Sequence, residues 1–330
     1  MVCLVPVVAC QAPSVTEESP ETSEAPIIFS VVGDAPVIEP RDYGAAYLLP
    51  GAAIVHAGTY HLYPVAFYAD RAEAPRVLHL TSVDGESWAG DPAASVLDDF
   101  EIELDGNGAI PSSAFVADDG TWVMYGSGRR PGGTDTVVWR ATAPGADGPW
   151  TAHPDPVLEP DGDGWDGAIT DHPGVIPTED GYLMGYGGAS VGSPNRNRIG
   201  FATSSDGVTW TRVAATLDGA DDDQALGPSA CGVEAPTMFE PHLLATDDGL
   251  ELVFGVMVAG EDDAMQILSA TSLDGLHWTC ATGTDVLASD DFPLAPGLHS
   301  FVAIEDEGTA FLLAEVLGDA SSELWLARAE

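Results

Sequence analysis

The chain has 330 residues, of which 45% are hydrophobic, and its 10 basic and 53 acidic side chains give a formal net charge of −43. A field of this sign repels nucleic acid and anionic lipid surfaces, so we exclude both as partners. The length would accommodate two average domains, but all-β repeat proteins of this size are commonly one domain with one large core.

The N-terminus predicts export. Residues 1–10 are a short apolar segment that ends in Val7-Val8-Ala9-Cys10, which resembles a bacterial lipobox, whose Cys is lipidated and becomes the mature first residue. Residues 11–34 begin with a Ser-, Thr-, Glu- and Pro-rich stretch typical of a disordered tether. We therefore expect an envelope protein, periplasmic or on the cell surface, that touches the membrane only through a lipid on Cys10. A cleaved signal peptide and a cytosolic chain are the alternatives, because the apolar stretch is short and no Lys or Arg precedes it.

The sequence has four cysteines. Cys10 would carry the lipid and Cys3 would be lost with the signal, which leaves Cys231 and Cys280. An envelope location permits a disulfide between them, and we predict one; two unrelated buried thiols are the alternative. The sequence has no C-x-x-C pair, so nothing in it indicates a zinc site.

From residue 82 onward a short turn phrase recurs, with its tryptophans 60 to 68 residues apart. The four copies are Ser82–Trp88, Gly145–Trp150, Ser205–Trp210 and Ser272–Trp278. Each contains Asp-Gly after a strand-like run, and Asp-Gly between such runs is a strong hairpin signal. We expect these four tryptophans to be structural.

A second turn marker lies upstream in each period and is followed by an apolar strand. It occurs at Ala57-Gly58, Asp119-Gly120, Asp180-Gly181, Asp248-Gly249 and Glu307-Gly308. Each unit thus contains four antiparallel strands, which is the composition of a propeller blade. We predict an all-β fold over residues 35–330, a single five-bladed β-propeller with four-stranded antiparallel blades. WD40 repeats are shorter than this period, so that class fits poorly.

The candidate site comes from the innermost strands, which line the channel of a propeller. We expect them to open at Leu49-Pro50, Ile110-Pro111, His172-Pro173, Glu240-Pro241 and His299-Ser300. Three adjacent units place ionisable side chains there, namely Asp171, His172, Glu240, His242 and His299. Paired carboxylates are the equipment for glycoside hydrolysis, in which one protonates the leaving oxygen and the other activates water or attacks. Turn formation by the acids and hydrogen-bonded filling of the channel by the imidazoles are the structural alternatives.

The segments Gly164–Ile176, Asp180–Tyr186 and Arg198–Trp210 resemble the five-bladed propellers of glycoside hydrolase families 43 and 32. The resemblance covers roughly residues 35–330 as a blade pattern, and its motifs specify the blade and not the reaction. It implies Glu240 as the catalytic acid and Asp171 as the orienting acid. Glu234 is a rival acid, because its Glu-x-Pro spacing is nearer the family pattern. The base that the family places one unit earlier is missing, since that unit has Ile110-Pro111.

Three functions therefore stay open. The first is an envelope glycosidase acting on arabinose-, xylose- or fructose-containing glycans, and the second is a non-catalytic propeller that binds a glycan or a protein. The third is a scaffold with a channel plugged by apolar residues such as Leu49 and Ile110. We expect a monomer with no cofactor or catalytic metal; a structural Ca²⁺ in the acidic loop Asp161–Asp166 is the minor alternative, since its spacing departs from an EF-hand. His172, His242 and His299 are candidate saccharide contacts, and Trp165 is a candidate stacking platform, with core packing as its alternative.

Overall fold

The computed structural model of the chain describes residues 27–70, 73–97, 109–129, 135–191, 197–217, 220–221, 226, 231, 237–246, 249–257, 265–280, 286–288, 291–292, 297–317 and 322–329. Within these ranges the regular structure is almost entirely strand, which confirms the expected all-β class; one short 3-10 helix, η1 (Pro40–Tyr43), precedes β2. The described residues contain no helix long and apolar enough to cross a membrane.

Antiparallel pairing gathers the strands into groups that follow chain order. The first group has β2 (Tyr47–His56), β3 (Thr59–Phe67), β4 (Arg76–Val77) and β5 (Leu80–Ser82). The next has β6 (Ile110–Val116), β7 (Trp122–Arg129), β8 (Thr136–Ala143) and β9 (Thr151–Ala152). It is followed by β10 (Ile169–Thr178), β11 (Gly181–Ala189), β12 (Arg198–Ser204) and β13 (Thr211–Val213).

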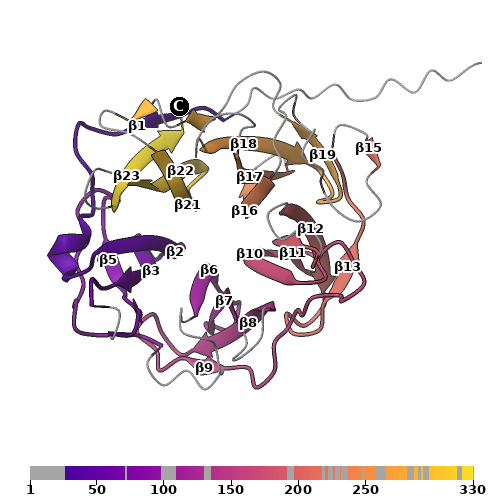
Figure 1. The fold of residues 1–330 in the computed structure, drawn as a ribbon, viewed down its shortest axis with the longest axis horizontal. Coiled ribbons are helices and arrows are strands. Elements are labelled where there is room, and N and C mark those ends of the chain that lie inside the picture. Colours follow the sequence, from indigo (N-terminus) through magenta and orange to yellow (C-terminus); the bar gives the residue numbers. More distant parts are fainter. Residues whose placement is uncertain are drawn as a thin grey trace, which may run out of the picture.

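The C-terminal part of the chain repeats this arrangement. One group has β16 (Thr237–Thr246), β17 (Gly249–Met257), β18 (Met265–Ser272), β19 (His277–Cys280) and β20 (Leu287–Ala288), with β14 (Thr216–Leu217) and β15 (Ala220–Asp221) added beside β19. The last has β21 (Gly297–Asp306), β22 (Thr309–Leu317), β23 (Ser322–Ala329) and β1 (Phe29–Val31). The groups surround a common centre, and β2, β6, β10, β16 and β21 are the strands nearest to it (Figure 1).

The core lies between neighbouring groups. Each of five hydrophobic clusters joins side chains from two groups that are adjacent in the ring. The joined residues include Tyr63 with Met124, Val123 with Met184, Leu183 with Leu252, Val253 with Leu312, and Leu313 with Leu62. Because the last pair brings the final group onto the first, the face-to-face packing closes on itself.

The N-terminal strand takes part in that closure. Phe29 pairs with Ala329 across β1 and β23, and the Phe29 ring is buried against β23 and its neighbours. The tether expected over residues 11–34 is therefore too long at its C-terminal end. The apolar residues after Pro26 instead complete the last sheet. The sequence did not predict this pairing, because it joins segments some 300 residues apart.

The recurrent turn phrase forms the predicted hairpins. In the third copy, Oδ1 of Asp206 accepts the backbone N–H groups of Val208 (2.8 Å) and Thr209 (2.7 Å). Asp84 and Asp274 cap their own turns in the same way. Asp147 differs: its Oδ1 lies 2.6 Å from Nδ1 of His79 in the neighbouring group. These turns lie at the outer edge of each group, away from the centre (Figure 1).

Candidate functional site at the mouth of the central channel

Each innermost strand carries a β-bulge, and the predicted opening positions coincide with these bulges. The register shifts fall between Leu49 and Ala52, Pro111 and Ser113, Asp171 and Gly174, Phe239 and His242, and Leu298 and Ser300. A bulge re-aims side chains and interrupts pairing, which is why bulges recur beside functional sites. The bulges define one end of the channel, which we call the mouth.

Two of the bulge residues have a backbone conformation that side chains rarely adopt. His172 has φ of +44° and Glu240 has φ of +52°. Such conformations cost of order 1–3 kcal/mol each and persist only where the surroundings enforce them. The bulge of β2 also has a residue with positive φ, Gly51 at +70°, where a Cβ atom would lie 2.1 Å from the carbonyl oxygen of Tyr63. The mouth therefore has two ionisable residues held in strained positions on neighbouring strands.

Glu240 is fixed by the next group along the ring. The Ser300 hydroxyl donates to Oε1 at 2.8 Å and the backbone N–H of Phe301 donates to Oε2 at 3.1 Å. Burial raises the pKa of the Glu240 carboxyl, and the nearby His172, the Ser300 hydroxyl and the Phe301 amide only partly offset that rise. Glu240 is therefore a well-ordered carboxyl with a strengthened tendency to hold a proton.

His172 lies between two carboxylates. Its Nδ1 is 3.5 Å from Oδ2 of Asp171, and its Nε2 is 3.7 Å from Oε1 of Glu240. Burial alone would lower the pKa of His172, but the carboxylates of Asp171 and Glu240 outweigh it and raise that pKa to about 9. The ring is thus an imidazolium at neutral pH, and its side chain is 30% exposed at the mouth.

The other two predicted imidazoles take different positions. His299 is the bulge residue of β21; its side chain is 56% exposed, and its Nδ1 lies 3.0 Å from Oε2 of Glu315. His242 follows the bulge of β16 and is buried, with its Nε2 3.1 Å from the carbonyl oxygen of Phe301. Burial lowers the pKa of His242 to about 4, so it is neutral and its Nε2–H donates to that carbonyl.

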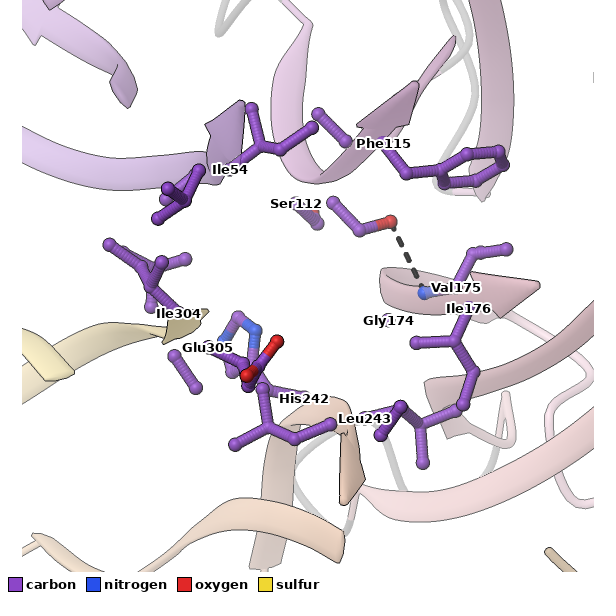
Figure 2. A pocket seen from close by; sticks show the side chains of 18 of the residues that line it. Ile54, Ser112, Phe115, Gly174, Val175, Ile176, His242, Leu243, Ile304 and Glu305 are labelled. Carbon is purple, nitrogen blue, oxygen red and sulfur yellow. Dashed lines mark hydrogen bonds between the residues drawn. The ribbon is translucent and has the colours of Figure 1, made fainter. Parts of the chain in front are cut away.

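Below the mouth, the channel encloses a cavity of about 340 Å³ lined by all the innermost strands. Figure 2 shows Ile54, Phe115, Ile176, Leu243 and Ile304 around it. The scaffold hypothesis expected apolar side chains to fill the channel, whereas these side chains line a cavity. Leu49 and Ile110, expected as plugs, instead pack in the cluster between the first two groups.

Trp165 packs on the blade that carries Asp171. Its ring stacks on Tyr186 with centroids 5.6 Å apart and covers Gly188 and Gly200, where a Cβ would come within 2.5 Å of the ring. These contacts are those of core packing. A role as a sugar-stacking platform stays a prediction.

The acidic loop beside Trp165 has an internal partner. Asp166 is buried, and its Oδ2 accepts from Arg212 Nε at 2.8 Å and from the Tyr186 hydroxyl at 3.0 Å. An ion pair therefore occupies the carboxylate that the Ca²⁺ alternative would need. The described residues contain no group of three or more ligand side chains suited to a metal ion.

Cys231 and Cys280 are joined by the predicted disulfide. Glu234, the rival acid, and Cys10, the expected lipidation site, lie outside the described residues.

Sequence reasoning missed the residues that hold the site together. Ser300 and the amide of Phe301 bind Glu240, and Glu315 binds His299. Glu315 could have been identified from the sequence, because it is a lone acid within the apolar run Phe311–Leu317. A carboxylate in such a run is expensive to bury unless it has a partner.

No family model and no curated protein matches the chain. Solved structures do match it. A glycosyl hydrolase from Bacteroides ovatus has a TM-score of 0.61 at 15% identity, over 93% of this chain and 97% of that one. A family 117 glycoside hydrolase produced by the marine bacterium Zobellia galactanivorans has a TM-score of 0.63 at 14% identity, over 93% and 92%. A thermostable family-43 glycoside hydrolase has a TM-score of 0.64 at 14% identity, over 87% and 90%. At these identities the likeness shows the fold alone. The chain has the glycoside hydrolase-like propeller fold that the sequence predicted.

Proposed function

We propose that the chain is a carbohydrate-active propeller that binds a saccharide at the mouth and cleaves a glycosidic bond there, with Glu240 as the general acid. The observation that carries the proposal is the cluster Asp171–His172–Glu240 on two neighbouring innermost strands. An imidazolium between two carboxyl groups, partly open to solvent, supplies both hydrogen-bond donors and acceptors for sugar hydroxyls.

The pKa of Glu240 supports its role. A glycosidase acid must carry its proton near neutral pH, and burial is the usual means of raising a carboxyl pKa to that range. Burial is the largest influence on Glu240 and acts in that direction. Asp171 acts as the orienting acid, because its Oδ2 lies 3.5 Å from the other nitrogen of His172 and its charge favours the imidazolium that faces Glu240.

We further propose that the fold has five blades and forms one domain. Five long hairpins begin at the strands nearest the centre, and five hydrophobic clusters join neighbouring groups within the described part of the chain. The substrates proposed are arabinose-, xylose- or fructose-containing glycans. The protein is proposed to be an envelope-anchored monomer lipidated at Cys10, and that proposal depends on the sequence alone.

Activity on a panel of aryl glycosides and plant or bacterial polysaccharides tests the proposal. We expect sugar release by the wild-type protein and a loss of at least about 100-fold in Glu240→Gln, which is the usual scale of general acid catalysis. Ser205→Ala, in an outer turn, serves as the control. A folded protein that releases no sugar from any substrate overturns the catalytic proposal.

Non-catalytic saccharide binding is the second candidate. The bulges of β2 and β6 carry Pro50-Gly51 and Ser112. Neither therefore supplies the third carboxylate found in glycoside hydrolase families 43 and 32, which the sequence resembles. Calorimetric titration with oligosaccharides separates the two functions. Binding without turnover, weakened in His172→Ala, would favour this candidate.

A further inference from the structure

The cavity in the channel, which we call the lower cavity, is distinct from the mouth. Its walls come from Ala53–His56, Ser112–Val116, Gly174–Pro177, His242–Ala245 and Val302–Glu305. Each of these segments runs from the bulge of its innermost strand, or just after it, towards the hairpin turn that ends the strand. Asp171, His172 and Glu240 do not line it.

The lower cavity opens at its turn end. His56, Pro177 and Glu305, which line it next to the hairpin turns, are exposed. Ser112 and Gly174, which line it next to the bulges, are buried. A small molecule can therefore enter from the face opposite the mouth.

The walls and the volume suit an apolar occupant. The five innermost strands each contribute a large apolar side chain to the walls (Figure 2), namely Ile54, Phe115, Ile176, Leu243 and Ile304. A cavity of about 150 Å³ with walls of this kind stays dry and binds benzene. At about 340 Å³ the lower cavity has room for roughly two fused rings.

The polar side chains that line the lower cavity have partners within the protein. The Ser113 hydroxyl accepts from the Val175 amide at 3.2 Å, and Nε2 of His242 donates to the Phe301 carbonyl at 3.1 Å. Glu305, at the opening, accepts from an amide of its own turn at 2.6 Å. An ion buried in this cavity would have no compensating charge, and the net charge of −43 disfavours anions further.

The backbone supplies the remaining polarity. Among the described strands, β2, β6, β16 and β21 each lie at the end of their sheet and pair on one side only. Their free edges face the centre of the ring (Figure 1). An edge strand presents amide and carbonyl groups without a strand partner, so the channel can hydrogen-bond a hydroxyl group on an otherwise apolar molecule.

We propose that the lower cavity is a second binding site, which takes a small uncharged molecule with an aromatic body of about two rings and a hydroxyl group. The apolar walls hold the rings, and the strand edges bind the hydroxyl. This site goes beyond the function proposed for the mouth and does not depend on it.

Two probes that differ in charge test the site. Calorimetric titration of the full chain at pH 7 should show one 2-naphthol bound per chain, with a Kd below about 1 mM for a ligand of this size. Naphthalene-2-sulfonate has the same rings and a fixed negative charge. It should bind at least about 10-fold more weakly, because its charge would be buried without a partner.

Two variants locate the bound probe. Ile54→Trp adds a ring to the wall and Ala245→Trp adds one at the opening, so each should weaken 2-naphthol binding at least about 10-fold by filling the space. Val83→Trp places the same ring on an exposed outer turn and should leave binding unchanged. Circular dichroism verifies that each variant is folded.

The outcomes separate this site from the mouth. No 2-naphthol binding at millimolar concentration, equally tight binding of the sulfonate, or 2-naphthol binding that neither cavity variant weakens overturns the proposal. Each of these results leaves the role of Glu240 untouched, because sugar release at the mouth is measured independently.

Discussion

Nε2 of His172 lies 3.7 Å from Oε1 of Glu240, and the two residues occupy the bulges of neighbouring innermost strands with backbone φ of +44° and +52°. Both are held in a region that favours glycine, so the contact persists only because surrounding groups enforce it. For Glu240 those groups are the Ser300 hydroxyl and the Phe301 amide. Strain at both positions is what the mouth of a working site would show.

The partners of Glu240 predict a graded loss of stability. Glu240→Ala leaves the buried Ser300 hydroxyl and Phe301 amide without an acceptor, at roughly 1–3 kcal/mol each. Glu240→Gln keeps one acceptor oxygen and should lose clearly less. Urea unfolding of the two variants checks this. Both variants place a residue with a side chain at the same positive φ, so the comparison between them is not affected by backbone strain. Equal stability of both variants and the wild type would show that these hydrogen bonds are not formed.

His172 predicts a loss of stability in alkali. Its pKa in the folded protein is about 9, above the ordinary 6.5, because of Asp171 and Glu240. The folded state therefore binds the proton more tightly than the unfolded state, and this stabilisation is complete below pH 6.5 and lost as the pH rises through about 9. The free energy of unfolding measured between pH 6 and 10 should fall less steeply in His172→Gln. Parallel curves for the two proteins would refute the raised pKa.

His61 predicts a loss of stability in acid. Burial, together with His79 and His56, lowers the pKa of His61 to about 4, while an unfolded histidine titrates near 6.5. The unfolded state then binds the proton more readily, so stability falls as the pH drops from 6.5 towards 4. His61→Gln should flatten this dependence by at most about 1.4 kcal/mol per pH unit. Ser205→Ala, at an exposed residue that does not titrate, is the control and should leave the slope unchanged.

The turn tryptophans predict a contrast between two copies of one motif. Trp278 is 1% exposed and stacks on Phe201, whereas Trp88 is only partly buried at its own turn. Trp278→Ala should cost about 3–5 kcal/mol, as for other fully buried aromatic residues, and Trp88→Ala should cost less. Denaturant midpoints with unchanged m-values would establish both numbers. A larger loss at Trp88 would contradict the packing described.

The sequence was informative where the signal is local. Asp-Gly turns such as Asp206-Gly207 and X-Pro positions such as Glu240-Pro241 marked the hairpins and the bulges, because backbone geometry at these points depends on few residues. Contacts that depend on register across groups were not predictable, and Ser300 with Glu240 is the clearest case. Phe29 shows the same limit, since its place in β1 depends on β23 at the other end of the chain.

The most direct test of the central claim is a crystal structure of Glu240→Gln with a bound oligosaccharide. The account predicts the sugar at the mouth, with its glycosidic oxygen within hydrogen-bonding distance of the amide that the substitution introduces, roughly 2.6–3.2 Å, and with His172 in contact with its hydroxyl groups. An oligosaccharide bound on another face, with the mouth occupied by solvent alone, would contradict it.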